Sequence, residues 1–596
     1  MMQEPAAAIR NQPVFRYLLG QFWPRLLACA VLSVVGGLLS VRMLVLINEV
    51  ISASAAAERT QLGLQFALVA VLAMVFQSAG QILLERLGQR IHADLRIYLA
   101  GQVNQADYRS LEMTGWGRLQ ASMSEHTQNI KYFFGLLPLL LTNLAIVLGG
   151  LVYMAVLSWW IFLLAVAVIG IGLLIYYRAD ARAAEHLDAA DRAQDRMLAF
   201  FHGLLSGAKE LRLHLGKRER FLQSHMYDSI RQVQRERSRG MTIYIISSVW
   251  HQFLIYLFIG LVLFVLVGDV SGQVQVMTGF ALLLVYMVGP LESVLGSLPT
   301  MKLAMISARH MEETVAGLLQ QEHVAGSHEA RHFRSLALQG VEHQYYNEAN
   351  SRSFTLGPVN LAFAPGELVY LVGGNGSGKT TLAKLLVGLY RPEAGQILVD
   401  GVAVTDADRD RYRQTFSAVF SDFHLFDSIL DGVSPAFDER GNAWLARLGL
   451  EHKVQIRDGA FTTRSLSQGQ RKRLALVVAC LEDRPFLVFD EWAADQDPVF
   501  RETFYGELLP ELRAMGKTVL VISHDDRYFH LADRLVRMAH GQVVSIEFPG
   551  GAAAAASGEA VHSFDRKAIQ VAMPTSSSGS HDADAGHLQP SARGGV

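Results

Sequence analysis

The sequence is poor in cysteine and carries almost no net charge. Its 596 residues include only Cys29 and Cys480, too few for a disulfide framework or a cysteine metal site, so both are expected to be small buried residues. The 53 basic and 55 acidic residues leave a formal net charge of −2, which gives no reason to expect a nucleic-acid partner. The N-terminal stretch lacks a short apolar core followed by a small-residue cleavage site, so we expect the first apolar segment to remain as an anchor.

Hydrophobic residues, by contrast, are abundant. They account for 51% of the chain, and 596 residues exceed what one domain usually holds. We therefore expect at least two domains, one of them in lipid. Six apolar stretches are long enough to cross a bilayer, which takes roughly 20 helical residues; they lie near residues 23–51, 63–88, 133–157, 160–178, 241–268 and 276–301.

The loops between these stretches predict the orientation in the membrane. Residues 86–132 hold six Lys or Arg and residues 178–240 hold thirteen, whereas the segments on the opposite side hold only Arg59. The positive-inside rule therefore places both long loops and both termini in the cytoplasm. Each long loop is predicted as two helical extensions with a break between them, near TGWGR and LRLHLGKRERF. These breaks either present short helices to a cytosolic partner or are solvated hairpins.

Polar residues inside the apolar stretches allow two interpretations. Arg42 and Glu49 lie seven residues apart on one face of the first stretch, and charges in lipid are costly unless they face a cavity or a partner. The other polar residues of this kind are Gln77, Gln81, Asn143, His251 and Gln252. Together they either line an amphipathic cavity or form hydrogen bonds between helices.

A phosphate-binding pattern lies beyond residue 335. The stretch ELVYLVGGNGSGKTTLAKLLVGLY predicts a strand, a glycine-rich turn and a helix, and it satisfies GxxxxGK[ST]. In such a loop backbone amides approach phosphate oxygens, Lys379 reaches the outer phosphates and the Thr380 hydroxyl ligates Mg²⁺. A second apolar strand, RPFLVFDE, ends in Asp490, which is placed to help hold Mg²⁺. The predicted phosphate-binding residues are Gly373, Gly374, Asn375, Gly376, Ser377, Gly378, Lys379, Thr380 and Thr381.

These motifs together resemble those of a known family. SLSQGQRKRLALVVACLEDRPFLVFDEWAADQDP followed by TVLVISHDD is similar to the nucleotide-binding domain of ATP-binding cassette (ABC) transporters. Six spans ahead of such a domain resemble an export half-transporter. LSQGQRKRLAL joined to FDEWAADQDP most resembles the cyclic-peptide exporters, the group that includes pyoverdine, syringomycin and microcin exporters. The resemblance implies an α-helical six-span transmembrane domain fused to an α/β P-loop NTPase nucleotide-binding domain.

The resemblance also implies roles for particular residues. Glu491 and His524 are the predicted catalytic residues, the first polarising the attacking water and the second contacting the γ-phosphate. The signature segment Ser467, Gln468, Gly469 and Gln470 is expected to meet ATP held by the other subunit. Asp497 falls where the family keeps an acid at the dimer interface, and Tyr345 is the predicted adenine-stacking aromatic, with Tyr346 as the alternative. ATP and Mg²⁺ are the expected ligands.

Three positions depart from the family pattern. Ser421 stands where a glutamine usually occurs, and we predict that it serves the metal site, with Asp422 or a water as the alternative route of coupling. Gln468 replaces the commonest glycine of the signature segment. Asp495 has no matching role in the family and is expected to be solvated.

The predicted organisation is a cytoplasmic segment 1–22, a transmembrane domain 23–310, a linker 311–334, a nucleotide-binding domain 335–547 and a disordered tail 548–596. The predicted function is ATP-driven export of a peptide, namely a nonribosomal siderophore, cyclic peptide or lipopeptide, by a homodimer in the bacterial inner membrane. A different half-transporter is the alternative partner, and periplasmic or outer-membrane export proteins are further candidates. The alternative functions are a multidrug or lipid exporter and a membrane-anchored regulatory ATPase.

Overall fold

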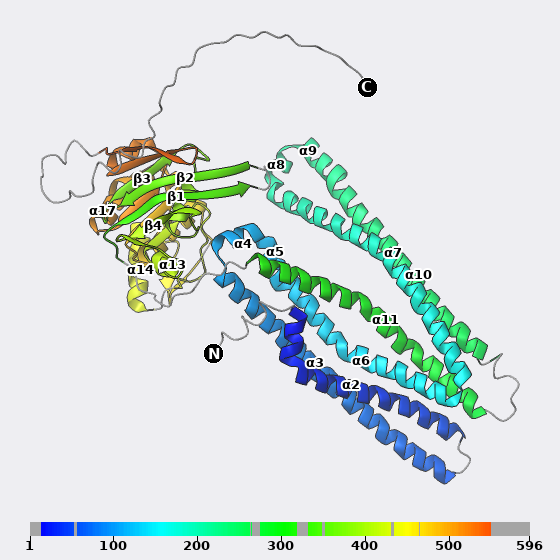
Figure 1. Cartoon of the computed structure of the whole chain (residues 1–596). Coiled ribbons are helices and arrows are strands. Elements are labelled where there is room, and N and C mark those ends of the chain that lie inside the picture. Colours follow the sequence, from blue (N-terminus) through cyan, green and yellow to red (C-terminus); the bar gives the residue numbers. More distant parts are fainter. Residues whose placement is uncertain are drawn as a thin grey trace, which may run out of the picture. The chain divides into compact units, whose positions relative to one another are not determined.

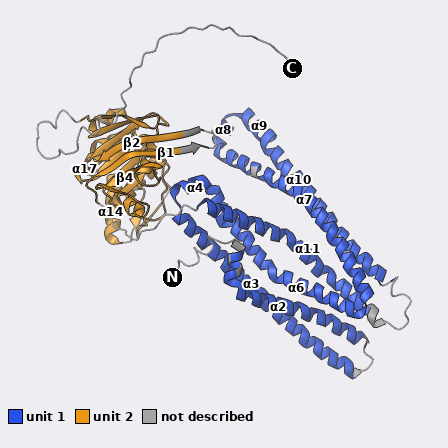
Figure 2. Cartoon of the chain, in the orientation of Figure 1, with its two compact units in different colours: residues 1–322 blue, residues 323–596 orange. Residues whose placement is uncertain are grey.

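The computed structural model describes residues 14–52, 56–262, 264, 274–318, 332–347, 352–430, 434–463 and 465–549. The chain divides into two compact units, Met1–Glu322 and His323–Val596 (Figure 2). All but the first two residues of the predicted tail 548–596, and much of the predicted linker 311–334, lie outside the described residues.

Within the described residues, six helices are long and apolar enough to cross a membrane, which confirms the predicted six-span domain. The helices that carry these spans are α2 (Val14–Ser52), α3 (Ala56–Gln105), α6 (Thr127–Leu157), α7 (Trp159–Ser206), α10 (Asp228–Leu261) and α11 (Val274–Gly317). Many of their apolar side chains are exposed, as on α3 at Leu64, Leu68 and Met74. Such an apolar surface suits contact with lipid rather than water.

Several helices are much longer than a bilayer requires. Helix α3 has 50 residues, about 75 Å at 1.5 Å per residue, whereas the hydrocarbon core measures about 30 Å. Both long loops break near the predicted positions, and short helices flank each break. Gly115, at a φ of 81°, separates α4 (Tyr108–Thr114) from α5 (Trp116–Ala121), and His214 separates α8 (Ala208–Leu213) from α9 (Leu215–Arg220). The π-helical turns η1 (Ser122–His126) and η2 (Phe221–Tyr227) lead into the next long helices.

The long helices pack in two groups (Figure 1). Helices α2 and α6 pack against each other and each packs against α3 and α11, and Leu84 and Phe134 lie in the core of this group. Helix α7 packs chiefly along α10, and the two form a hairpin that meets the other helices through α6 and α11. Met154, Phe258 and Phe280 contribute to the core at that contact.

The C-terminal unit is built on a six-stranded sheet in the order β12–β11–β3–β10–β9–β6, in which only the β12–β11 pair is antiparallel. Its strands are β3 (Leu368–Gly373), β6 (Phe416–Val419), β9 (Phe486–Asp490), β10 (Thr518–Ile522), β11 (Arg534–Ala539) and β12 (Gln542–Glu547). A second, antiparallel sheet has the order β2–β1–β4–β5, with β1 (Leu336–Asn347), β2 (Arg352–Phe363), β4 (Ala394–Val399) and β5 (Val402–Ala403).

Helices and short elements complete this unit: α12 (Lys379–Leu386), α13 (Arg409–Arg413), α14 (Pro435–Arg447), β7 (Ile456–Arg457), β8 (Ala460–Phe461), α15 (Gln468–Leu481), η4 (Trp492–Asp495), α16 (Pro498–Thr503), η5 (Phe504–Leu508), α17 (Leu509–Ala514) and η6 (Asp526–Leu531). Strands β9 and β10 are fully buried, as continuous apolar runs in a covered parallel sheet should be. Phe489 of β9 lies in the same core cluster as Trp492 and Phe504.

The carboxyl ends of three adjacent parallel strands carry the predicted chemistry. Strand β3 ends at Gly373, β9 ends at Asp490, and His524 follows two residues after the end of β10. These strands are neighbours in the order β3–β10–β9. Open α/β sheets bind ligands beyond the carboxyl ends of their strands, so the sheet topology gathers the predicted residues at one edge.

Candidate functional site

The turn after β3 needs glycine at two positions for steric reasons. A Cβ on Gly373 would lie 2.2 Å from the carbonyl oxygen of Met538, and one on Gly378 would lie 2.7 Å from Cδ1 of Leu356. Both residues have φ values, 156° and 98°, that side chains disfavour. Gly374, Asn375 and Gly376 between them are exposed. The loop therefore combines a rigid base with an open edge on which phosphate oxygens can approach backbone amides.

Lys379 begins helix α12 and folds its ammonium group back over the loop. Its Nζ donates to the carbonyl oxygens of Gly373 and Gly374, both at 3.0 Å. Burial lowers the pKa of Lys379, while the nearby carboxylates of Glu491 and Asp490 act in the opposite direction. The ammonium group is thus held by weak neutral acceptors at the loop, where a phosphate would be a stronger partner.

The remaining predicted loop residues are fixed by short-range contacts. The Ser377 amide donates to the Gly374 carbonyl at 3.2 Å, and the Ser377 carbonyl accepts from the Gly541 amide at 3.1 Å. Thr381 lies half-buried in the first turn of α12. These contacts tie the loop to the turn between β11 and β12.

Thr380 and Asp490 form a pair suited to a hard cation. The Thr380 hydroxyl donates to Oδ2 of Asp490 at 3.0 Å, and Asp490 is 1% exposed. Its other oxygen, Oδ1, is buried and has no well-oriented hydrogen-bond donor among the described residues. Burial raises the pKa of this carboxyl, against the effect of the Thr380 hydrogen bond. An orphaned carboxylate oxygen beside a hydroxyl fits Mg²⁺, which prefers such oxygen ligands.

Ser421 reaches this pair through its main chain. Its backbone amide acts on the Asp490 carboxylate and lowers the pKa of Asp490, whereas the Ser421 side chain is exposed just beyond β6. Residue 421 is therefore next to the candidate metal site. The role of its hydroxyl in binding the metal stays a prediction.

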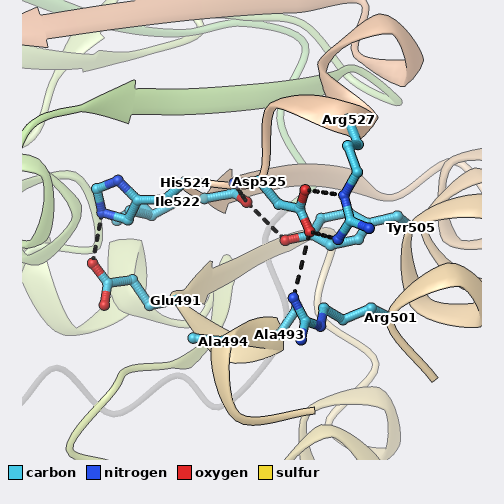
Figure 3. Close-up of a pocket in the computed structure, with 10 residues that line it drawn as sticks. Glu491, Ala493, Ala494, Arg501, Tyr505, Ile522, His524, Asp525 and Arg527 are labelled. Carbon is cyan, nitrogen blue, oxygen red and sulfur yellow. Dashed lines mark hydrogen bonds and ion pairs between the residues drawn. The ribbon is translucent and has the colours of Figure 1, made fainter. Parts of the chain in front are cut away.

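Glu491 and His524 face each other across one end of a cavity of about 260 Å³ (Figure 3). Oε1 of Glu491 lies 3.1 Å from Nε2 of His524. Glu491 has a φ of 49° and a ψ of 31°, a left-handed conformation that costs on the order of 1 kcal/mol or more for a residue with a side chain. Its amide donates to the carbonyl of Ile522 on the neighbouring strand at 3.1 Å. The carboxylate is thus aimed by a strained turn that the sheet holds in place.

An ionised aspartate anchors the loop that carries His524. Arg527 donates to both oxygens of Asp525, at 2.8 and 2.7 Å, and Arg501 lies 3.7 Å from the same carboxylate. The hydrogen bonds from Arg527 are the main reason that the pKa of Asp525 lies below its usual value. Ser523 accepts from the Asp525 amide at 3.1 Å. Figure 3 shows Asp525, Arg527 and Arg501 at the opposite end of the cavity from Glu491.

The signature segment starts helix α15 with a capping box. Oγ of Ser467 accepts from the Gln470 amide at 3.4 Å, and Oε1 of Gln470 accepts from the Ser467 amide at 3.0 Å. Gln470 is therefore committed to its own helix terminus. Gly469 directs its carbonyl to Nε2 of Gln496 at 3.0 Å, and Nε2 of Gln468 donates to Oδ2 of Asp495 at 3.0 Å.

Asp495 is exposed to solvent, as expected, but it also takes part in an ion pair that the sequence did not predict. Besides Gln468 it contacts Lys472, whose Nζ lies 2.8 Å from Oδ2 of Asp495. The hydrogen bond from Lys472 is the main cause that lowers the pKa of Asp495. The physical reason is that Lys472 is 4% exposed and a buried ammonium needs an anionic partner. Sequence reasoning overlooked Lys472, because it is the middle of three consecutive basic residues and nothing in the sequence marks it as buried.

Asp497 is the N-cap of helix α16. Its Oδ1 accepts from the Phe500 amide at 2.8 Å, and its Oδ2 accepts from Arg473 at 2.6 Å. The hydrogen bond from the Phe500 amide is the largest cause that lowers the pKa of Asp497. Arg473 also lies 3.8 Å from the centre of the Phe500 ring. The segment that contains Asp497 is thus fastened to α15, and a role at a dimer interface stays a prediction.

Tyr345 lies on β1 opposite Phe354 of β2. Its side chain and that of Tyr346 fall outside the described residues. Their predicted alternative roles in adenine stacking therefore stay predictions.

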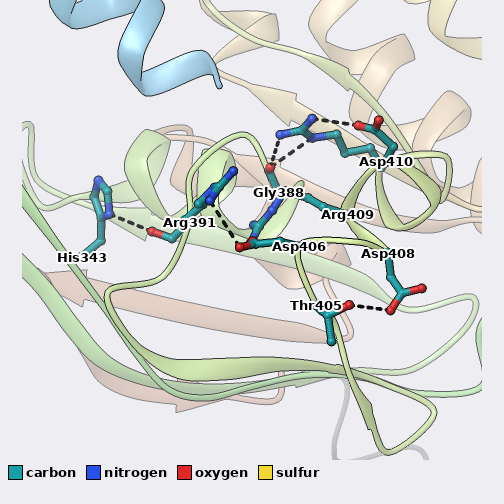
Figure 4. A network of polar contacts seen from close by, with 9 residues as sticks. His343, Gly388, Arg391, Thr405, Asp406, Asp408, Arg409 and Asp410 are labelled. Carbon is teal, nitrogen blue, oxygen red and sulfur yellow. Dashed lines mark hydrogen bonds and ion pairs between the residues drawn. The ribbon is translucent and has the colours of Figure 1, made fainter. Parts of the chain in front are cut away.

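A polar network joins the turn that follows helix α12 to the segment around α13 (Figure 4). Arg413 donates twice to the carbonyl of Gly388, at 3.0 and 2.7 Å. Asp406 bridges two further arginines, at 3.3 Å to Arg391 and 2.5 Å to Arg409. The Gly388 carbonyl lies two residues beyond the last residue of α12, so Arg413 fixes the turn that follows the helix.

In the membrane domain the polar residues divide between the two interpretations. Nε2 of Gln77 donates to Oγ of Ser40 at 2.9 Å, and Nδ2 of Asn143 donates to Oγ of Ser293 at 2.7 Å. Both contacts join two helices, so these residues act in helix packing. Gln81 is exposed and Gln252 half-buried, and the His251 side chain lies outside the described residues.

Arg42 and Glu49 differ from that pattern. They form an ion pair with each other, 3.0 Å from Nη1 to Oε1, and their side chains are 47% and 35% exposed. Neither side chain makes another hydrogen bond to the described part of the chain. The described helices therefore leave the pair partly uncovered, with Arg42 exposed and Glu49 half-buried.

The fold and the site define a membrane protein whose six spans are joined to a nucleotide-hydrolysing domain. Comparison with known proteins agrees with this class. Residues 26–291 match the model of the ABC transporter transmembrane region, and residues 356–494 match the ABC transporter model. The chain belongs to the ABC transporter family. It is an ATP-binding, multi-pass membrane protein of a family that hydrolyses ATP to drive transport.

Individual relatives resemble both domains. The chain is 34% identical to the ATP-binding protein SyrD of Pseudomonas syringae pv. syringae over 494 residues, which cover 80% of this chain and 86% of that protein. It is 27% identical to an ATP-dependent lipid A-core flippase of Thiobacillus denitrificans over 482 residues, covering 77% and 80%. The structure of a bacterial Atm1-family ABC exporter with ATP bound superposes with a TM-score of 0.70 at 17% identity, covering 90% of this chain and 97% of that chain. The last similarity shows the fold alone.

Proposed function

We propose that the chain acts as a homodimer that exports a peptide across the bacterial inner membrane, the peptide being a nonribosomal siderophore, a cyclic peptide or a lipopeptide. The observation that carries this proposal is the match to SyrD at 34% identity through both domains. The sequence resemblance of LSQGQRKRLAL and FDEWAADQDP to cyclic-peptide exporters supports the same subgroup. The excess of Lys and Arg in the two long loops supports a cytoplasmic location for the nucleotide-binding domain and both termini.

In this proposal each ATP is bound between two chains. Lys379 and the glycine loop hold the phosphates of one nucleotide, and the signature segment at Ser467 of the second chain meets the γ-phosphate. Mg²⁺, held by Thr380 and Asp490, would neutralise phosphate charge. Glu491 orients the attacking water through its carboxylate, and His524, 3.1 Å away, contacts the γ-phosphate. ATP shifts the two chains towards a closed state only to the extent that it binds this state more tightly.

The ion pair on α2 supports a cargo with both charged and apolar parts. The side chains of Arg42 and Glu49 are only partly covered by the described part of their own chain, yet charges within a span are costly in lipid. The face that carries them is therefore assigned to the translocation path or to the second chain. In the path, the remaining guanidinium donors and carboxylate lone pairs would bind a carboxylate and an ammonium group of a peptide.

The proposal is tested with purified protein in liposomes. A cyclic lipopeptide and a peptide siderophore should each stimulate ATP hydrolysis and accumulate inside inverted vesicles, and neither should occur with Glu491→Gln. An uncharged lipophilic drug serves as the matched control. Stimulation by the drug alone would refute the peptide cargo while leaving the ATPase intact.

A lipid exporter is the second candidate, because several ATP-dependent lipid A-core flippases match this chain. Lipid A in the same vesicles separates the two, since a lipid exporter would move lipid A and ignore the peptides. A regulatory ATPase would hydrolyse ATP without moving either compound. Cross-linking of single-cysteine variants in vesicles distinguishes a homodimer from a pair with a different half-transporter.

A further inference from the structure

Lys472 connects the signature segment to the turn that carries Glu491. It is a lysine with 4% exposure on helix α15, five residues after Ser467. Its Nζ contacts Oδ2 of Asp495 at 2.8 Å and donates to the backbone carbonyl of Glu491 at 3.1 Å. One ammonium group thus holds both ends of the segment from Glu491 to Asp495.

The contacts of Lys472 extend towards the signature segment on one side and towards the pair of Glu491 and His524 on the other. Towards the signature segment, Gln468 donates to the same oxygen of Asp495 at 3.0 Å. Towards the hydrolytic pair, the carboxylate of Glu491 lies 3.1 Å from His524. The Lys472 carbonyl also accepts from Nε1 of the buried Trp492 at 2.8 Å. A continuous series of polar contacts therefore runs from Gln468 through Asp495 and Lys472 to Glu491.

The backbone of Glu491 is the point at which such a series can act. This residue adopts a left-handed conformation with a φ of 49°, and a carbonyl in that conformation has a direction that an extended backbone would not give it. Lys472 binds that carbonyl, so a displacement of Lys472 turns the peptide that follows Glu491. A shift of about 1 Å in a catalytic group can cost on the order of 100-fold in rate.

We propose that Lys472 and Asp495 form a relay that positions Glu491 according to the state of the signature segment. In the dimer proposed above, that segment meets the nucleotide of the second chain, so the relay makes hydrolysis in one site depend on occupancy of the other. Lys472 is a positioning residue, because it acts through Glu491 and not on the nucleotide. The dependence on the second site rests on the proposed dimer, whereas the positioning of Glu491 within one chain does not.

The test compares ATPase kinetics of the full-length protein in lipid nanodiscs. Lys472→Met keeps the chain length and removes the charge, and Lys472→Arg keeps the charge. Lys517→Met is the matched control, because Lys517 forms a lysine–aspartate pair with Asp483 at 2.6 Å in the same domain. We expect Lys472→Met to lower kcat between about 10- and 100-fold with little change in the KM for ATP and a lower Hill coefficient. Lys472→Arg should restore most of the rate, because the lysine acts as a point charge and not through a planar fork.

A double-mutant cycle separates positioning from mere stability. If Lys472 acts through Glu491, adding Lys472→Met to Glu491→Gln should lower the single-turnover rate no further. Additive losses, or a kcat of Lys472→Met equal to that of Lys517→Met, would overturn the relay. If Lys472→Met lowers kcat as expected but leaves the Hill coefficient of a cross-linked dimer unchanged, the coupling between the two sites would be overturned. None of these outcomes bears on the peptide cargo, which the transport assay tests separately.

Discussion

Replacing Glu491 with glutamine should stop hydrolysis and preserve ATP binding. Loss of a positioned general base typically costs 10²- to 10⁴-fold in rate, so we expect kcat to fall by that factor, which corresponds to a rise of about 3–5 kcal/mol in the activation free energy. The fold should be unaffected, because the side chain is 39% exposed and glutamine has the same shape. The glutamine amide can still contact His524, which lies 3.1 Å from the Glu491 carboxylate in the unchanged protein. Removing a negative charge beside the γ-phosphate should also tighten ATP binding.

The assay measures phosphate release and retained nucleotide on the same sample after rapid desalting. We expect Glu491→Gln to retain ATP, whereas the unchanged protein retains little. Glu502→Gln is the control, because Glu502 is an exposed glutamate of helix α16 in the same domain. Hydrolysis by Glu491→Gln at the rate of the control would show that another group activates the water.

Four further outcomes follow from the structure. Gly373→Ala should abolish ATP binding, since its Cβ would lie 2.2 Å from a carbonyl oxygen, whereas Gly374→Ala meets no atom within 4 Å and should keep most binding, as equilibrium binding of a fluorescent ATP analogue would report. Arg42→Glu should abolish peptide stimulation of the ATPase, and adding Glu49→Arg should restore it in part. Asp497→Ala should destabilise helix α16 by about 1 kcal/mol, seen as a lower Tm. Because contacts hold the pKa of Asp497 low, this contribution is present above a pH of about 4 and is lost as pH falls through the folded pKa, so Asp497→Ala should differ least from the parent protein at acid pH.

Elements with strong periodic or compositional signals could be predicted from the sequence. Six apolar runs predicted six spans because the bilayer imposes a minimum helix length. The apolar runs that end at Gly373 and Asp490 predicted two strands, and the topology of the sheet then brings their ends together. The glycine at position 373 is required by the turn itself, because a Cβ there would collide with the carbonyl oxygen of Met538.

Contacts between segments distant in sequence could not be predicted in this way. Gln77 and Asn143 are polar residues within apolar stretches, a pattern that also fits residues lining a cavity. Only their partners Ser40 and Ser293 identify them as packing contacts. The ion pair of Asp495 could not be predicted because its partner Lys472 lies 23 residues away, on a helix whose buried face the sequence did not reveal. Pairing of this kind depends on how α15 packs against β6 and η4, which local propensity does not determine.

The segment from Glu491 to Asp497 also bears on how much work ATP can perform. Reversing a conformational equilibrium from 1:99 to 99:1 requires about 5.5 kcal/mol of differential binding. In the proposed homodimer two nucleotides share this requirement, so each must favour the closed state by roughly half of it. A few hydrogen bonds to charged groups between the signature segment and the γ-phosphate supply energies of that size. The energy is useful for transport only if hydrolysis follows closure, and a carboxylate whose position depends on the signature segment would impose that order.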